Sequence, residues 1–336
     1  MKRLALAALV AGLLAAAAAG AGALWLRGAL APVRAEAPAV DFEVKRGASL
    51  KAVAAALAQL GLIRNARAFE LRARWRELAG RLQVGEYALS AAMPADGILT
   101  ILAEGRVKTY EVAIPEGWTA REIAARLAGD GITSEREFLA VVAAPESAER
   151  FGVEGPGLEG YLYPETYRFP RGLRAEKVVG VLVEHFLRAW GEVEAEARRQ
   201  DLGMRELVIL ASIVEKETGA PGERPLIAAV FRNRLARGMR LASDPTTIYG
   251  IPDFDGNLRR RDLEDGTNPY NTYMIGGLPP GPIANPGIDS LRAVISPAKT
   301  SYLFFVSRND GTHVFARSYE EHERNVDRYQ RKGRRR

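Results

Sequence analysis

The amino-acid sequence predicts an α+β protein that is held to a membrane by one N-terminal helix. Three observations favour this fold: an uncharged apolar segment at the N-terminus, short strand patterns that lead into amphipathic helices, and one long apolar helix in the second half. At 336 residues the chain is long enough for two globular parts. The lack of cysteine excludes disulfides, zinc thiolate sites and the acylated cysteine of a lipoprotein.

The apolar segment, residues 4–26, can form a transmembrane helix, because about 20 apolar residues cross the hydrocarbon core of a bilayer. A cleaved signal peptide is the alternative, since residues 21–23 resemble a cleavage site, but the apolar core of a signal peptide spans only about 7–15 residues. We therefore expect a retained, single-pass anchor in the inner (cytoplasmic) membrane. The flanking basic residues slightly favour residues 1–3 in the cytoplasm.

The net charge of +6 does not by itself indicate a nucleic-acid partner, because most basic residues alternate with acidic ones, as on solvated helix faces. Only the tail, residues 331–336, is a dense basic cluster, and we expect a solvated, disordered end there. His185, His313 and His322 show no metal-ligand spacing. The sequence therefore predicts no metal, no other cofactor and no nucleic-acid partner.

Residues 27–40 mix proline with small and charged residues, which predicts a linker. The folded part is expected to begin near Asp41, with a strand at residues 42–44. A turn at Gly47 and an N-cap at Ser49 then introduce a helix with an apolar face.

The same strand-turn-helix unit recurs 70 residues later (117 minus 47), where Gly117 and Thr119 take the places of Gly47 and Ser49. We interpret the repeat as a duplicated β/α module. The first copy continues with a strand at residues 84–89 and an apolar helix that Gly105 ends. This β-α-α-β pattern, over residues 41–107, resembles a LysM module, which many cell-wall proteins use to hold glycans that contain N-acetylglucosamine.

In the second half, residues 174–203 are helical and charged, and residues 204–218 contain a continuous apolar run that predicts a buried helix. The last third is rich in Pro, Gly and Asn, with a late strand at residues 302–306. Long loops of such composition often carry function.

The buried helix places Glu215 and Glu217 in its last turn. Residues two apart on a helix point about 200° away from each other, so only one of the two carboxylates can face a cleft. Apolar surroundings and the partial negative charge of a helix C-terminus both raise the pKa of a carboxyl group, which is the property of a general acid. The alternative is that both glutamates simply finish the helix.

Residues 211–218 (Ala-Ser-Ile-Val-Glu-Lys-Glu-Thr) resemble the signature of the MltG/YceG family of endolytic murein transglycosylases, whose catalytic glutamate is the second of the motif. That residue is Glu217. The likeness extends in the same order over nearly the whole chain, with motifs at residues 158–167, 230–235, 238–241, 243–246, 248–250, 270–273, 277–283 and 285–287.

The resemblance implies that residues 108–330 form a catalytic domain that faces the periplasm or the cell wall. This domain would cleave the MurNAc-GlcNAc bond of peptidoglycan as a lytic transglycosylase, a carbon-oxygen lyase that leaves 1,6-anhydro-MurNAc ends. Glu217 would serve as its single acid/base. The family is associated with the termination of nascent glycan strands, which makes peptidoglycan synthases candidate partners.

Several side chains in these motifs suit the binding of sugars. Short polar groups can bond to hydroxyl and N-acetyl groups, and tyrosines offer flat faces for sugar rings. Ordinary turn formation or core packing is the competing interpretation for each. The candidate substrate-binding residues are Glu215, Asp244, Thr246, Tyr249, Asn271, Tyr273, Tyr163 and Glu165.

Two alternatives remain open. A peptidoglycan hydrolase would need a second carboxylate to activate water or to form a covalent intermediate, and Asp244 or Glu165 could serve. A non-catalytic wall-binding scaffold would use the LysM-like module for binding, with the Glu-rich helix as a structural element. The products distinguish the three functions, as 1,6-anhydro ends, reducing ends or none.

Overall fold

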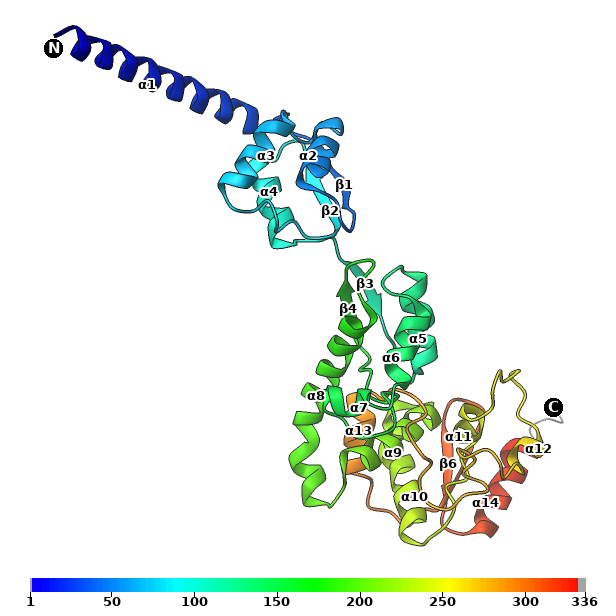
Figure 1. Ribbon diagram of the computed structural model, residues 1–336. Helices are drawn as coiled ribbons and strands as arrows, with labels where there is room; N and C mark the ends of the chain where they lie inside the picture. Colours follow the sequence, from blue (N-terminus) through cyan, green and yellow to red (C-terminus); the bar gives the residue numbers. More distant parts are fainter. Residues whose placement is uncertain (1, 332–336) are drawn as a thin grey trace. The chain divides into compact units, whose positions relative to one another are not determined.

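The computed structural model describes residues 2–331 and has a mixed α+β fold, as predicted (Figure 1). It divides into two compact units, one of residues up to 110 with residues 170–172, and one of residues 111–169 and 173 onward. Apart from Arg331, the predicted basic tail lies outside the described residues, as does Met1.

The chain begins with helix α1 (Lys2–Leu30). Within residues 2–331 this is the one helix long and apolar enough to cross a membrane, over Leu9–Leu30, with a mean hydropathy of 2.0. The predicted linker of residues 27–40 is shorter in the structure. The helix continues through Leu30, whose side chain is buried in the core of the first unit, and the first strand already begins at Ala39.

The first unit contains an antiparallel pair, β1 (Ala39–Val44) and β2 (Gly85–Ser90), with Phe42 opposite Tyr87. Both of these rings are buried, as the alternating pattern of β1 requires. Ser49 caps the first helix of the unit through a hydrogen bond from the backbone N–H of Ala52, as predicted. The helices that pack on the pair are α2 (Leu50–Gln59), α3 (Ala66–Trp75) and α4 (Ala95–Glu104).

The predicted repeat is present in the structure. Gly47 and Gly117 both adopt a positive φ, of 79° and 76°, a conformation that favours glycine. Ser49 and Thr119 then each cap a helix. The second copy contains β3 (Tyr110–Ala113), α5 (Ala120–Gly129), α6 (Glu135–Ala143), α7 (Ser147–Phe151) and β4 (Thr166–Phe169), with β3 paired to β4. Both copies therefore follow the order strand, helices, strand.

The rest of the second unit is mainly helical. The predicted buried helix is α9 (Met204–Glu217) (Figure 1). It contacts four other helices: α8 (Ala175–Arg199), α10 (Arg224–Ala236), α11 (Asp244–Tyr249) and α13 (Ile288–Ile295). The last third, predicted to consist largely of loops, also contains short helices and a hairpin. The other elements of this part of the chain are a 3-10 turn (Pro221–Glu223), α12 (Arg260–Leu263), β5 (Phe304–Ser307), β6 (His313–Ala316) and α14 (Tyr319–Val326).

Candidate active site

The candidate site is built on the C-terminal turn of α9. Every residue from Leu207 to Val214 is buried, so the helix is fixed by neighbours on all sides. Thr218 ends the helix in an extended conformation, and its hydroxyl donates a hydrogen bond of 2.6 Å to the carbonyl oxygen of Val214. The last turn, which carries Glu215, Lys216 and Glu217, is thereby held in a defined position.

Glu217 is partly buried, and its Oε1 accepts a hydrogen bond of 2.6 Å from the hydroxyl of Ser243. The pKa of Glu217 is raised to about 7, mainly by burial and also by the negative charge of Asp244. The hydrogen bond from Ser243 and the nearby His313 and Arg234 act in the opposite direction. Near neutral pH the carboxyl group can therefore both hold and release a proton, as acid/base catalysis requires.

Arg234 of α10 fixes two loops beside this carboxyl. Its Nε donates to the carbonyl oxygen of Leu303 (2.6 Å) and its Nη1 to that of Leu241 (2.5 Å). Behind it, the imidazole Nδ1 of His313 lies 2.7 Å from a carboxylate oxygen of Glu223, which ties the β5–β6 hairpin to the 3-10 turn. The surroundings of Glu217 are therefore supported by three separate segments of the chain.

Asp244 and Tyr273, two of the predicted site residues, lie together next to Glu217. The phenol of Tyr273 donates a hydrogen bond of 2.7 Å to Asp244 Oδ1, and the charges of both Asp244 and Glu217 raise the pKa of Tyr273, after burial as the main cause. Asp244 is exposed and Tyr273 is partly buried. Both side chains are therefore placed where a ligand at Glu217 can meet them.

Thr246 and Asn271 have supporting roles instead of the predicted contacts with substrate, because both are fully buried. The hydroxyl of Thr246 donates to the carbonyl oxygen of Ser243 at 2.6 Å and so fixes the residue that bonds to Glu217. The side-chain amide of Asn271 donates to three backbone carbonyl oxygens of the preceding loop, those of Asp262, Leu263 and Asp265.

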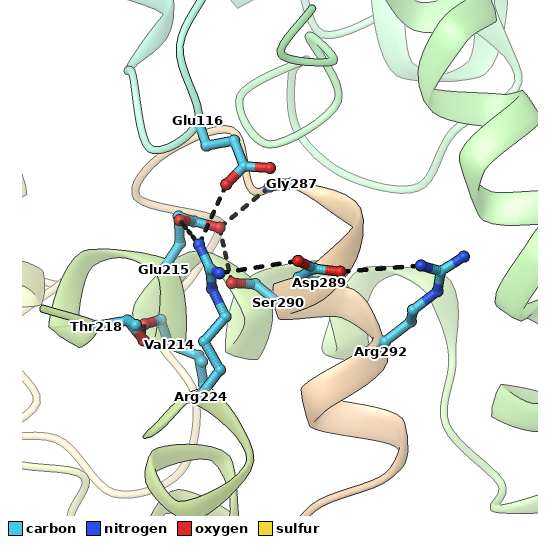
Figure 2. Close-up of polar contacts among 9 residues, drawn as sticks. All are labelled: Glu116, Val214, Glu215, Thr218, Arg224, Gly287, Asp289, Ser290 and Arg292. Atoms are coloured by element: carbon cyan, nitrogen blue, oxygen red, sulfur yellow. Dashed lines mark hydrogen bonds and ion pairs between the residues drawn. The ribbon is translucent and has the colours of Figure 1, made fainter. Parts of the chain in front are cut away.

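The carboxylate of Glu215 lies in a polar cluster between α9, α10 and α13 (Figure 2). Its Oε1 accepts from Arg224 at 3.0 Å, and its Oε2 accepts from the hydroxyl of Ser290 at 2.7 Å and from the N–H of Gly287 at 3.2 Å. Its side chain is only 7% exposed. The structure therefore gives Glu215 internal partners in place of the predicted substrate contact.

The same Arg224 also pairs with Glu116, at 3.1 Å, in the turn before α5 (Figure 2). Burial and the negative charge of Glu215 raise the pKa of Glu116, and Arg224 counteracts this effect. One arginine thus links the turn of the second β/α copy to the helix that carries Glu217.

Tyr163 and Glu165 lie beside α8. The carboxylate of Glu165 contacts His185 of that helix, and the backbone carbonyl of Tyr163 accepts a hydrogen bond from the phenol of Tyr167. Among the described residues, neither side chain has a polar contact with Glu217. The structure does not bring these two predicted residues to the candidate site.

Tyr249 lines a pocket of 1170 Å³ that borders the site, since Lys216 and Pro245 also line it. The phenol of Tyr249 donates to Glu159 at 3.1 Å, and burial raises the pKa of Glu159 to about 7. Glu159 also accepts from Asn285 at 2.8 Å.

Glu159 and Ser243 were not among the predicted site residues, although both belong to motifs that were noted in the sequence. Their position inside those motifs is the sequence signal that could have identified them as site residues. Over the part of the chain that the structure describes, no group of three or more His, Asp or Glu side chains is arranged to hold a metal ion.

Comparisons with known proteins relate most of the chain to one family. The model of the YceG-like family matches residues 42–328. An endolytic murein transglycosylase of Bacillus subtilis (strain 168) is 29% identical over 327 residues, which cover 92% of this chain and 90% of the relative. An endolytic murein transglycosylase of Streptococcus pneumoniae serotype 2 is 30% identical, over 85% of this chain and 58% of the relative. The crystal structure of a YceG-like protein from Listeria monocytogenes aligns with a TM-score of 0.59 and 31% identity, over 86% of this chain and all of that one.

Proposed function

The chain belongs to the YceG-like family, and from this premise we propose that it is an endolytic murein transglycosylase with Glu217 as its catalytic acid/base. Relatives that carry this name match most of its length. The observation that carries the assignment is the carboxyl of Glu217 itself. It ends a rigid buried helix, has a pKa raised to about 7, and lies beside the exposed Asp244.

The proposed reaction needs one group in two successive roles. Protonated Glu217 donates its proton to the oxygen between C1 of MurNAc and the next GlcNAc, the C1–O bond breaks, and positive charge develops at C1. The Glu217 carboxylate then takes the proton from the 6-hydroxyl of the same MurNAc as O6 bonds to C1. The products are a 1,6-anhydro end and a free GlcNAc hydroxyl, and no water is consumed.

The neighbours of Glu217 suit these two roles. The hydroxyl of Ser243 stabilises the carboxylate that remains after the first proton transfer, which keeps it ready to act as a base. The negative charge of Asp244 helps to keep Glu217 protonated beforehand and also favours a positive C1. Tyr273 holds Asp244 in place through its phenol.

A glycoside hydrolase is the second candidate, and the position of Asp244 is the observation that favours it. Asp244 is an exposed carboxylate next to Glu217, where it can activate a water molecule, whereas Glu165 is engaged with His185. Mass spectrometry of purified strands after digestion distinguishes the two. We expect 1,6-anhydro ends, and reducing MurNAc ends would support the hydrolase instead.

The membrane anchor, the region of residues 41–107, the catalytic domain and the partner proteins are also part of the proposed function. Helix α1 would be retained as an anchor in the cytoplasmic membrane, and the region of residues 41–107 would be a LysM-like module that binds glycan without chemistry. Residues 108–330 would form the catalytic domain, beside peptidoglycan synthases whose nascent strands it terminates.

Deletion of residues 41–107 should weaken binding to sacculi and preserve slow cleavage of short strands. Complete loss of turnover in a folded deletion variant would contradict this division.

A further inference from the structure

One face of α3 exposes two large apolar side chains to solvent. Leu71 is 57% and Trp75 is 74% exposed, although this helix also contributes the buried Phe69 to the core. Arg67 and Arg74 share the exposed face, because residues 67, 71, 74 and 75 follow the helical spacing i, i+4, i+7 and i+8. The outer face of α3 is therefore both apolar and basic.

The exposed indole has a defined position. The guanidinium of Arg72 lies over the ring of Trp75, at 4.5 Å from its centroid. Arg72 is itself held by a salt bridge of 2.7 Å to Asp96 at the start of α4. Trp75 is thus oriented by its neighbours while most of its surface stays uncovered.

Trp75 lies at the end of the apolar helix α1. Together with Arg72 and Asp96 it lines a pocket of 690 Å³, which α1 borders through Leu26, Arg27 and Leu30. Leu30 belongs to the buried core of the unit and Leu26 packs against that core, so this end of α1 is attached to the folded unit. Trp25, 52% exposed on α1, is close by in the sequence.

The length of α1 places this region at a bilayer surface. The 22 residues of Leu9–Leu30 would extend about 33 Å at 1.5 Å per residue, close to the thickness of a hydrocarbon core of about 30 Å. A bilayer that contains this span therefore ends near Arg27 and Leu30. Tryptophan concentrates at this level of membranes, and arginine is attracted to anionic headgroups.

We propose that the outer face of α3 is a membrane-docking surface for anionic lipid, with Leu71 and Trp75 in the interfacial layer and Arg67 and Arg74 against the headgroups. The proposal rests on the retained membrane anchor and is independent of the reaction at Glu217. The small unit would lie on the bilayer with a fixed face, through α3 as well as through α1.

The lack of cysteine allows a direct measurement of depth, because each introduced cysteine carries the single label of the chain. Full-length Leu71→Cys would be labelled with a nitroxide and reconstituted in vesicles of phosphatidylglycerol and phosphatidylethanolamine. Its collision rates with oxygen, which concentrates in the bilayer, and with a water-soluble nickel complex would be compared by electron paramagnetic resonance. Leu14→Cys, in the apolar span, and Lys45→Cys, exposed beyond the end of β1, are the matched references.

We expect the label at residue 71 to give an oxygen-to-nickel ratio between those of the two references. Adding Trp75→Ser should lower that ratio towards the value at residue 45, and Trp75→Phe should lower it less. A label at residue 71 that matches residue 45, while residue 14 reports the bilayer, would overturn the docking surface and leave the anchor intact. Water-like ratios at both residues 14 and 71 would overturn both. Protection of residue 71 by chitin oligosaccharides without lipid would show a sugar-binding face instead and also overturn the proposal.

Discussion

Ser243 and Glu217 are 26 residues apart in sequence, yet a hydrogen bond of 2.6 Å joins the serine hydroxyl to the glutamate carboxylate. Ser243 is 1% exposed and is held from behind by Thr246 and Thr272. The bond favours the ionised carboxylate, whereas burial of Glu217 favours the neutral acid. The balance between these two effects sets the working pH range of the candidate catalyst, and several predictions depend on it.

Glu217→Gln should abolish the formation of 1,6-anhydro ends and leave folding and glycan binding nearly unchanged. The amide keeps the shape of the side chain but cannot deliver a proton. A positioned acid/base contributes about 10²–10⁴-fold, and the loss should reach or exceed the upper end because one group serves both steps. The measurement counts anhydro ends by mass spectrometry, with circular dichroism as the check on folding.

Glu206→Gln is the matched control, since Glu206 is an exposed glutamate in the first turn of the same helix. It should retain the wild-type rate. A Glu217→Gln enzyme that cleaves as fast as this control would remove Glu217 from the mechanism.

The alkaline limb of the pH–rate profile should follow the pKa of Glu217. Cleavage starts from the protonated acid, so kcat/KM should fall as the pH rises through about 7. Ser243→Ala removes a bond to the carboxylate and should move the limb to higher pH. Asp244→Asn removes a negative charge and should move it to lower pH, each by about half to one pH unit. Shifts of both variants in the same direction would refute this electrostatic account.

Stability should fall as the pH rises from about 4.5 to about 7, because the folded pKa of Glu217 lies above its ordinary value of 4.5. In that range the folded state binds more protons than the unfolded state, so deprotonation favours unfolding. Glu217→Gln should reduce the loss of unfolding free energy between pH 5 and pH 8 by on the order of 2 kcal/mol. Part of the loss should persist, because the pKa of Glu159 is raised in the same direction. Urea denaturation at several pH values gives the comparison, and identical pH dependences would count against a raised pKa at Glu217.

Arg224→Met should destabilise the fold more than Glu215→Gln. Removal of the arginine leaves the buried Glu215 carboxylate without its cationic partner, which costs about 3–5 kcal/mol. The glutamine can still accept from Ser290 and Gly287, so its cost should be about 1–3 kcal/mol, with a partial loss of activity.

The double variant should cost less than the sum of the two, as in a double-mutant cycle followed by chemical denaturation. An inactive Glu215→Gln enzyme of unchanged stability would instead assign Glu215 a direct role with the substrate.

The sequence patterns were sufficient to predict α9, the repeated strand-turn-helix unit and the separation of Glu215 from Glu217, because helical periodicity and turn chemistry are local properties. Contacts between distant segments were not predictable in this way. Thr246 and Asn271 looked like sugar ligands, but the hydroxyl of Thr246 bonds to that of Thr272, 26 residues away, and the side-chain oxygen of Asn271 accepts from Thr247, 24 residues away. A motif indicates that its residues are important for the site. It does not distinguish the residues that contact the ligand from those that hold the contacting residues in place.

The two copies of the strand-turn-helix unit differ at a position that matters for the site. Arg46 of the first copy is exposed to solvent, whereas its counterpart Glu116 shares Arg224 with Glu215. A repeated unit can keep the same buried core while the side chains of its exposed turn differ. The turn of the second copy supplies Glu116 as an acidic partner for Arg224, and this copy therefore helps to support the helix that carries the candidate acid/base.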